Sequence, residues 1–229
     1  MCNSPFSLFQ IPLLSLNDQS GDISMETTII TLTDDLFIGK GYHKKCYRHP
    51  HDPGLCIKMA YSDEGQKDLD REIKYLKVLK RKNKNYDILP AYYGPIETNL
   101  GTGHVYEFIQ DINGGQCKTL TDYLQDPTLL NSNVSMLIEE LQKLKTDLIE
   151  NEIITMDIFP TNILVQWRGE SNYRLRVIND MGSPALIPLE YYFSSIAKAK
   201  IIRHWNRFIQ HLERNYSDPA ILPLIQAIK

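Results

Sequence analysis

Three short blocks of residues occur in the order that phosphoryl transfer from a nucleotide would require. Lys58 lies in the apolar run at 55–60, an Asp-x-x-x-x-Asn pattern lies at 157–162, and an Asp-x-Gly pattern lies at 180–182. Phosphoryl transfer needs a cation over the phosphates, oxygen ligands for magnesium and a base for the acceptor. These residue types supply all three, so the ordered set predicts a phosphotransferase site.

Each of these residues has the role that its chemistry favours. Lys58 would hold the α- and β-phosphates of ATP, and Glu72, in a following helix, would hold its ammonium group. Asp157 would accept a proton from the acceptor hydroxyl. Asn162 and Asp180 offer hard oxygen ligands for Mg²⁺. The predicted catalytic residues are therefore Asp157, Lys58 and Glu72, and the predicted metal ligands are Asn162 and Asp180.

Two glycines precede the lysine and extend the order of motifs. Gly39 and Gly41 would let a backbone turn approach the phosphates closely. Lys44 stands where a third glycine would complete a glycine-rich loop. Cys56 is a small neighbour on the face of Lys58, which leaves room for a flat ring. We therefore predict that Gly39, Gly41, Cys56 and Lys58 contact the nucleotide.

Each motif taken alone has a simpler explanation. A lone lysine in a strand usually faces solvent, and Glu72 alone could lie on a helix surface. Asp157 and Asn162 flank Pro160, where turn chemistry accounts for both. It is the ordered set, and no single motif, that favours a nucleotide site.

The first half of the chain is rich in predicted strands. The pattern predicts strands over 27–38, 45–48, 55–61 and 104–109 and a helix over 63–82. In this helix Leu69, Ile73, Leu76 and Leu79 form one apolar stripe, and Glu72 falls inside it. A buried carboxylate without a cation is costly, and Lys58 is the natural partner.

The second half is mainly helical. A polar, glycine-rich stretch at 110–115 is the predicted hinge, followed by helices over 119–125, 133–151 and about 192–213 and strands over 163–167 and 173–179. We expect an α+β, two-lobed protein-kinase-like fold, with a strand-rich N-lobe over 25–111 and a shortened, mainly helical C-lobe over 112–229. Residues 1–24 are expected to form a flexible N-terminal extension.

Composition limits the classes of partner. The chain has 229 residues, of which 42% are apolar, enough for a sizeable core. A net charge of −3 gives no basic field for nucleic acid. The apolar stretches are too short for a membrane span. Four cysteines without a C-x-x-C pattern indicate a reduced, cytoplasmic protein.

Seven segments carry a resemblance to known proteins. They are Gly39-x-Gly41-x-His43-x-Lys45-Cys46-Tyr47, Cys56-Ile57-Lys58, Arg71–Tyr75, Gly101–Tyr106, Thr155-Met156, Pro160–Leu164 and Trp205–Ile209. Over about 31–212 the chain resembles the bacterial YrbL family of PhoP regulatory network proteins and, more generally, the protein-kinase-like fold. The resemblance implies a regulatory network that responds to low magnesium and acid. It also implies that the backbone of Glu107 and Ile109 contacts the adenine edge.

The chain departs from the usual kinase pattern at several positions. Thr155 and Met156 replace the His-Arg pair before the catalytic aspartate, and Phe159 replaces a lysine that touches the transferred phosphate in many kinases. The segment after Gly182 is short and lacks Ala-Pro-Glu. These departures argue against a conventional protein kinase.

Three functional hypotheses remain. The first is an ATP- and Mg²⁺-dependent phosphotransferase that acts on a small molecule or an unidentified protein. The second is a catalytically weak or inactive pseudokinase that binds nucleotide and presents its lobes to a regulatory partner. The third is an interaction protein that binds no nucleotide.

Overall fold

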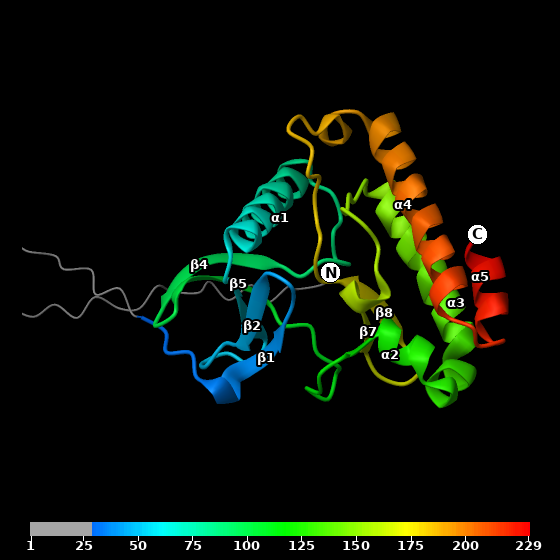
Figure 1. The fold of residues 1–229 in the computed structure, drawn as a ribbon, viewed down its shortest axis with the longest axis horizontal. Helices are drawn as coiled ribbons and strands as arrows, with labels where there is room; N and C mark the ends of the chain where they lie inside the picture. The colour runs from blue at the N-terminus through cyan, green and yellow to red at the C-terminus, as the bar shows by residue number, and fades with distance from the viewer. Residues whose placement is uncertain (1–28) are drawn as a thin grey trace, which may run out of the picture.

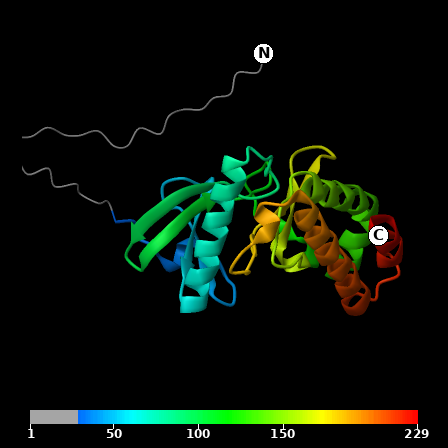
Figure 2. The same cartoon turned by 90° about the horizontal axis from the view of Figure 1, so that it is seen from above.

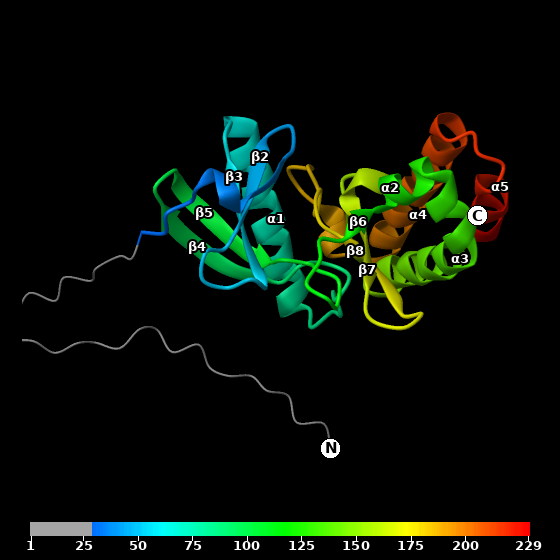
Figure 3. The same cartoon turned by 90° about the horizontal axis from the view of Figure 1, so that it is seen from below.

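The computed structural model describes residues 29–229, and the predicted N-terminal extension lies outside this range. The chain has an α+β fold of two lobes, in which a strand-rich N-lobe is followed by a mainly helical C-lobe, as expected (Figure 1). Seen from below, the two lobes lie side by side, with the small sheet of the C-lobe facing the N-lobe (Figure 3).

The N-lobe is built on an antiparallel sheet of five strands. Their order is β1-β2-β3-β5-β4, with β1 at Phe37–Lys40, β2 at Lys44–Arg48, β3 at Leu55–Ala60, β4 at Tyr92–Thr98 and β5 at Gly101–Glu107. In β3, Ile57 and Met59 join Tyr47 and Val105 in a buried cluster. Because side chains alternate along a strand, Lys58 points to the opposite face, toward the cleft.

Helix α1 (Asp63–Arg81) lies across one face of this sheet (Figure 2). Ser62 caps it by accepting a hydrogen bond from Gly65 N at 3.2 Å. The predicted apolar stripe, Leu69, Ile73, Leu76 and Leu79, is buried, and Glu72 is buried within it. The helix therefore carries a carboxylate into the space between the lobes.

The C-lobe combines helices with a small antiparallel sheet. Its elements are β6 (Lys118–Thr119), α2 (Leu120–Gln125), α3 (Pro127–Glu150), β7 (Ile163–Trp167), β8 (Tyr173–Val177), α4 (Ser194–Asn215) and α5 (Ile221–Ile228). Short 3-10 helices lie at η1 (Asp34–Leu36), η2 (Pro160–Asn162) and η3 (Leu189–Tyr191). One hydrophobic core runs from α1 through the C-lobe helices.

Several element boundaries differ from the expectations. The strand expected over 27–38 begins only at Phe37, because Asp34 and Asp35 form a 3-10 turn before it; Ile30 makes a single bridge to Thr98. Helix α3 begins earlier than expected, since Asp126 caps it and Pro127 fits its first turn. Helix α5 was not predicted.

Within residues 29–229, no helix combines the length and the apolar character needed to cross a membrane.

Candidate functional site

Lys58 reaches from the N-lobe sheet to the C-lobe. Its Nζ donates hydrogen bonds to Ile178 O at 2.7 Å and to Asn179 Oδ1 at 3.2 Å. The ammonium also lies 4.6 Å from the centroid of the Tyr106 ring, a cation–π contact. The buried lysine is thus held by neutral groups on the segment that follows β8.

Glu72 carries one negative charge between two lysines. Lys44 Nζ lies 2.6 Å from Glu72 Oε1, and Lys58 Nζ lies 3.7 Å from Glu72 Oε2. The expected contact between Lys58 and Glu72 is therefore an ion pair that is too long for a hydrogen bond. The close contact with Glu72 is made by Lys44. The reason is that the contacts with Ile178 and Asn179 draw the Lys58 ammonium toward the C-lobe.

Asn162 and Asp180 meet because their flanking strands are paired. Ile163, the first residue of β7, lies opposite Val177, the last residue of β8. Asn162 therefore faces the chain that leaves β8, and its Nδ2 donates to Asp180 Oδ2 at 2.7 Å. Asn179 Nδ2 lies 3.4 Å from Asn162 Oδ1. A continuous chain of contacts thus links Lys58 to Asp180.

Asn162 and Asp180 suit Mg²⁺ better than they suit a metal ion that is held by protein ligands alone. Across the described residues, no three or more His, Cys, Asp or Glu side chains form a group that could hold a metal. Mg²⁺ usually takes one or two protein oxygen ligands and completes its shell with waters and phosphate oxygens. Asn162 and Asp180 would supply such a set.

The backbone at Asp180 has an unusual conformation. Its φ is +61°, a left-handed value that is uncommon for a residue other than glycine. Asp180 O accepts from Met156 N at 2.7 Å, and Gly182 N donates to Ile154 O at 2.8 Å. These bonds hold the Asp-Met-Gly turn beside the loop that carries Asp157. At Gly182 (φ +88°) a Cβ would come within 2.9 Å of Tyr191 Oη.

The carboxyl group of Asp180 is largely buried beside charged neighbours. Burial raises its pKa above the usual aspartate value, and the nearby charge of Glu72 adds to this, while Lys44 acts in the opposite direction. Desolvation disfavours the charged form, and a bound cation would restore it. In the unliganded protein the charged carboxylate is a cost to stability at neutral pH.

Asp157 lies in the same loop as Asn162 and is half-buried. Its Oδ1 accepts from Ile158 N at 3.2 Å. On its other side is His204 of α4: burial lowers the pKa of that histidine, and the charge of Asp157 counters the effect. Asp157 directly follows Met156, whose N–H bonds to Asp180 O, so its backbone lies next to the pair of predicted metal ligands.

The end of β5 and the linker after it offer carbonyl groups that have weak partners. Cys56 Sγ donates to Glu107 O at 3.7 Å, and Cys117 Sγ donates to Ile109 O at 3.7 Å. A thiol is a weak donor, so a ligand amine could replace it. Glu107 N, in contrast, already donates to Ala91 O at 2.8 Å, so the backbone of Glu107 can offer only its carbonyl to adenine.

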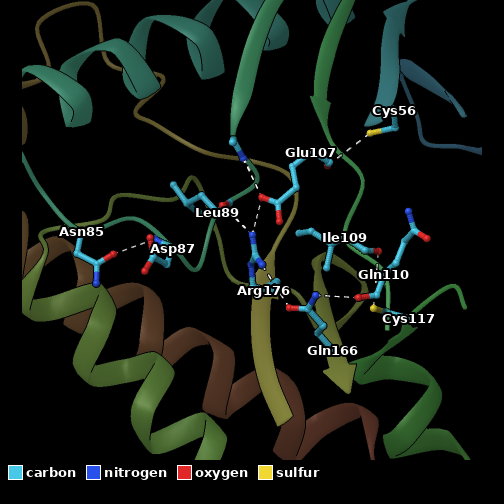
Figure 4. A network of polar contacts seen from close by, with 11 residues as sticks. Cys56, Asn85, Asp87, Leu89, Glu107, Ile109, Gln110, Cys117, Gln166 and Arg176 are labelled. Carbon is cyan, nitrogen blue, oxygen red and sulfur yellow. Dashed lines mark hydrogen bonds and ion pairs between the residues drawn. The ribbon is translucent and has the colours of Figure 1, made fainter. Parts of the chain in front are cut away.

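The side chain of Glu107 connects the two lobes (Figure 4). Its Oε2 accepts from Arg176 Nη2 at 2.8 Å and from Ala91 N at 3.1 Å. Arg176 also donates to Leu89 O and to Gln166 Oε1, at 3.2 Å each. This network fixes the end of β5 against β8. It adds a structural role to the nucleotide contact that the resemblance implies.

The two predicted loop glycines lie in the hairpin of β1 and β2, with Gly39 inside β1 and Gly41 in the turn. Gly41 N donates to Lys44 O at 2.8 Å, which closes the hairpin. A Cβ at Gly39 would meet no atom within 4 Å. Neither residue has a positive φ, so the protein's own conformation does not require glycine at 39. The open space beside it leaves room for a phosphate.

Four residues that contact this site were given no role by the sequence analysis. Lys44 had a visible signal, since it stands in the third position of a glycine-rich loop. Asn179, Tyr106 and Arg176 had none, because their roles depend on contacts between segments far apart in the sequence.

Two cavities open on the C-lobe. The first cavity, of about 340 Å³, includes Phe159, Pro160 and Thr161 of the catalytic loop and His211 of α4. The second, of about 360 Å³, lies along α4 and includes Lys200 and Glu190. The first adjoins the predicted chemistry, since its loop is flanked by Asp157 and Asn162.

Comparisons with known proteins show the family to which the chain belongs. Residues 30–213 match the family described as PhoP regulatory network protein YrbL. The chain is 37% identical over 183 residues to "Uncharacterized protein YrbL" of Escherichia coli and of Shigella flexneri, covering 79% of this chain and 87% of each relative. A solved double mutant of the Mycobacterium tuberculosis PknI kinase domain aligns with a TM-score of 0.42 and 11% identity, over 63% of this chain and 56% of that chain.

Proposed function

Since the chain belongs to the YrbL family of PhoP regulatory network proteins and has a kinase-like fold, we propose that it is an ATP- and Mg²⁺-dependent phosphotransferase. The main support is the chain of contacts from Lys58 through Asn179 and Asn162 to Asp180. It brings an ammonium of one lobe together with oxygen ligands of the other. Phosphoryl transfer depends chiefly on such positioning and on charge stabilisation.

Each residue has one task in this proposal. Lys58 binds the α- and β-phosphates, and Glu72 orients its ammonium. Asn162 and Asp180 would hold Mg²⁺, which would neutralise charge on the phosphates. Asp157 accepts the proton of the acceptor hydroxyl. The carbonyls of Glu107 and Ile109 would accept from the adenine amine, and Gly39 and Gly41 would leave space for the phosphates.

The acceptor is proposed to be a small molecule or a protein segment that uses the cavity beside Phe159. The side chains that line this cavity include no lysine, arginine, aspartate or glutamate; they are Thr121, Gln125, Phe159, Pro160, Thr161, His211, Asn215 and Tyr216. Such a lining favours an uncharged group with hydroxyls or rings. The free thiols of Cys46, Cys56 and Cys117 support a reducing, cytoplasmic setting.

A pseudokinase that binds nucleotide as a regulatory module is the second candidate. Phe159 replaces a phosphate-contacting lysine, and its ring packs edge-on against His211 with centroids 5.7 Å apart. The loop therefore offers an aromatic ring in place of a cation. Loss of one preorganised donor lowers a rate by roughly 10²–10³-fold. A pseudokinase would be stabilised by ATP without turnover.

Turnover by the purified full chain tests the leading proposal. We expect phosphate release from Mg·ATP, or incorporation of labelled phosphate into protein, to fall by about 10²–10⁴-fold in Asp157→Asn, because the variant loses the base. Wild-type activity no higher than that of the variant, with ATP still raising the melting temperature, would favour the pseudokinase. An interaction protein without nucleotide would show no stabilisation by any nucleotide.

A further inference from the structure

Lys44 and Lys58 direct their ammonium groups to the same buried carboxylate. In the pairing of β2 with β3, Cys46 lies opposite Lys58, and Lys44 is two residues from Cys46 on the same face. Lys44 Nζ lies 2.6 Å from Glu72 Oε1, and its side chain is 14% exposed. Lys44 thus extends into the cleft from the strand that follows the glycine turn.

Glu72 cannot balance both lysines. It carries one negative charge, is fully buried, and its Oε2 has no hydrogen-bond partner among the described residues. Lys58 is held by neutral acceptors, so one ammonium remains without a full counter-charge. Nearby, Arg71 is already paired with Asp68 at 2.9 Å. Asp180 is a further anion near Lys44, and a divalent cation bound to it would leave this group of charges with a net positive charge.

We propose that Lys44 is a second phosphate-binding lysine, which contacts the polyphosphate of the nucleotide beside Lys58. This inference rests on the proposed function. Lys44 occupies the position where a third loop glycine would otherwise offer only a backbone N–H, and it brings a full positive charge. An ammonium has three donors, so Lys44 can keep its bond to Glu72 while it binds a phosphate oxygen. The flexible stem of lysine allows the small adjustment this requires.

The ratio of affinities for Mg·ATP and adenosine tests this role. We expect Lys44→Met to weaken binding of Mg·ATP by roughly 10- to 100-fold, the range for a charge-assisted hydrogen bond, and to leave adenosine binding within about twofold. Lys45→Met is the matched control, because Lys45 lies on the other face of β2 opposite Met59. An unchanged preference for Mg·ATP over adenosine in Lys44→Met would overturn the assignment. A structural role alone would alter both affinities together.

A second measurement uses the wild-type chain, in case Lys44→Met folds poorly. An acyl-phosphate derivative of ATP transfers its acyl group to a lysine beside the phosphates: an amide bond forms at Nζ, the mixed anhydride breaks and ATP leaves. Mass spectrometry should find the label on both Lys44 and Lys58 and not on Lys45. Label on Lys58 alone would refute the role of Lys44. A wild-type chain that binds neither ATP nor adenosine would refute the proposed function itself.

Discussion

At the scale of single residues, Asp180 shows how a side chain proposed to bind a metal ion can oppose stability. Its backbone takes a left-handed φ of +61°, and burial raises its pKa. Both features are costs for the unliganded chain, and they persist where surrounding bonds impose them. Met156 N and Asn162 Nδ2 supply those bonds.

The variant Asp180→Asn should therefore separate stability from ligand binding. It removes the desolvated charge, keeps an oxygen that can accept from Asn162, and tolerates a left-handed backbone. We expect the melting temperature without ligand to rise at neutral pH, while stabilisation by Mg·ATP is lost. Differential scanning calorimetry with and without Mg·ATP checks both effects. A lower melting temperature without ligand would show that the carboxylate is a structural group.

The raised pKa of Asp180 also predicts a dependence on pH. Because its pKa is higher in the folded chain than in the unfolded chain, the folded chain binds the proton more tightly. The unliganded chain should gain stability from this group as the pH falls through the raised pKa. Mg²⁺ requires the charged carboxylate, so affinity for Mg·ATP should decrease over the same interval. Affinity that is constant from neutral to mildly acid pH would contradict this role.

The residue types and their order predicted that Lys58, Asn162 and Asp180 lie in one site, and a chain of contacts links these three side chains. They could not predict that Lys44, and not Lys58, makes the close contact with Glu72. That result depends on Ile178 O, a backbone group that lies 120 residues from Lys58 in the chain. No sequence pattern reports the position of a carbonyl in another lobe.

At the scale of elements, the long periodic segments were predictable and the short or interrupted ones were not. Helix α1 agrees with the prediction within one residue, because its apolar stripe is regular and Ser62 caps it. Helix α5 has the same helical spacing of buried residues, which are Ile221, Leu224, Ile225 and Ile228. It was not predicted because Pro223 interrupts the sequence pattern. Proline is compatible with the first turn of a helix, where its missing N–H has no partner to lose.

Helix α5 seals the C-lobe core, and its two leucines provide a matched test. Leu224 is fully buried, whereas Leu222 is 61% exposed. We expect Leu224→Ala to lower the free energy of unfolding by about 3 kcal/mol, which reduces the melting temperature by roughly 6–12 °C. Leu222→Ala should have almost no effect. Equal effects of the two substitutions in thermal unfolding would contradict the packing of α5.

At the scale of the whole molecule, several polar contacts join the lobes, among them those of Tyr75 Oη with Glu152 O and Ile154 N, and two further connections bear on the proposed site. Arg176 and Glu107 join β8 to the end of β5, and Lys58 joins β3 to the segment after β8. The second connection uses the groups that are proposed to bind nucleotide. A ligand that competes for Lys58 would therefore act directly on the contact between the lobes, whereas the Arg176 network would hold them together.

The central claim is that Lys58 and Asp180 bind one Mg·ATP between the lobes, and calorimetric titration of the full chain measures this most directly. We expect one nucleotide per chain, dependence on Mg²⁺, and a loss of affinity of roughly 10- to 100-fold in Lys58→Met. Lys74→Met, at an exposed position of α1, should bind like the wild type. No binding of Mg·ATP by the wild type, or equal binding by Lys58→Met, would contradict the account.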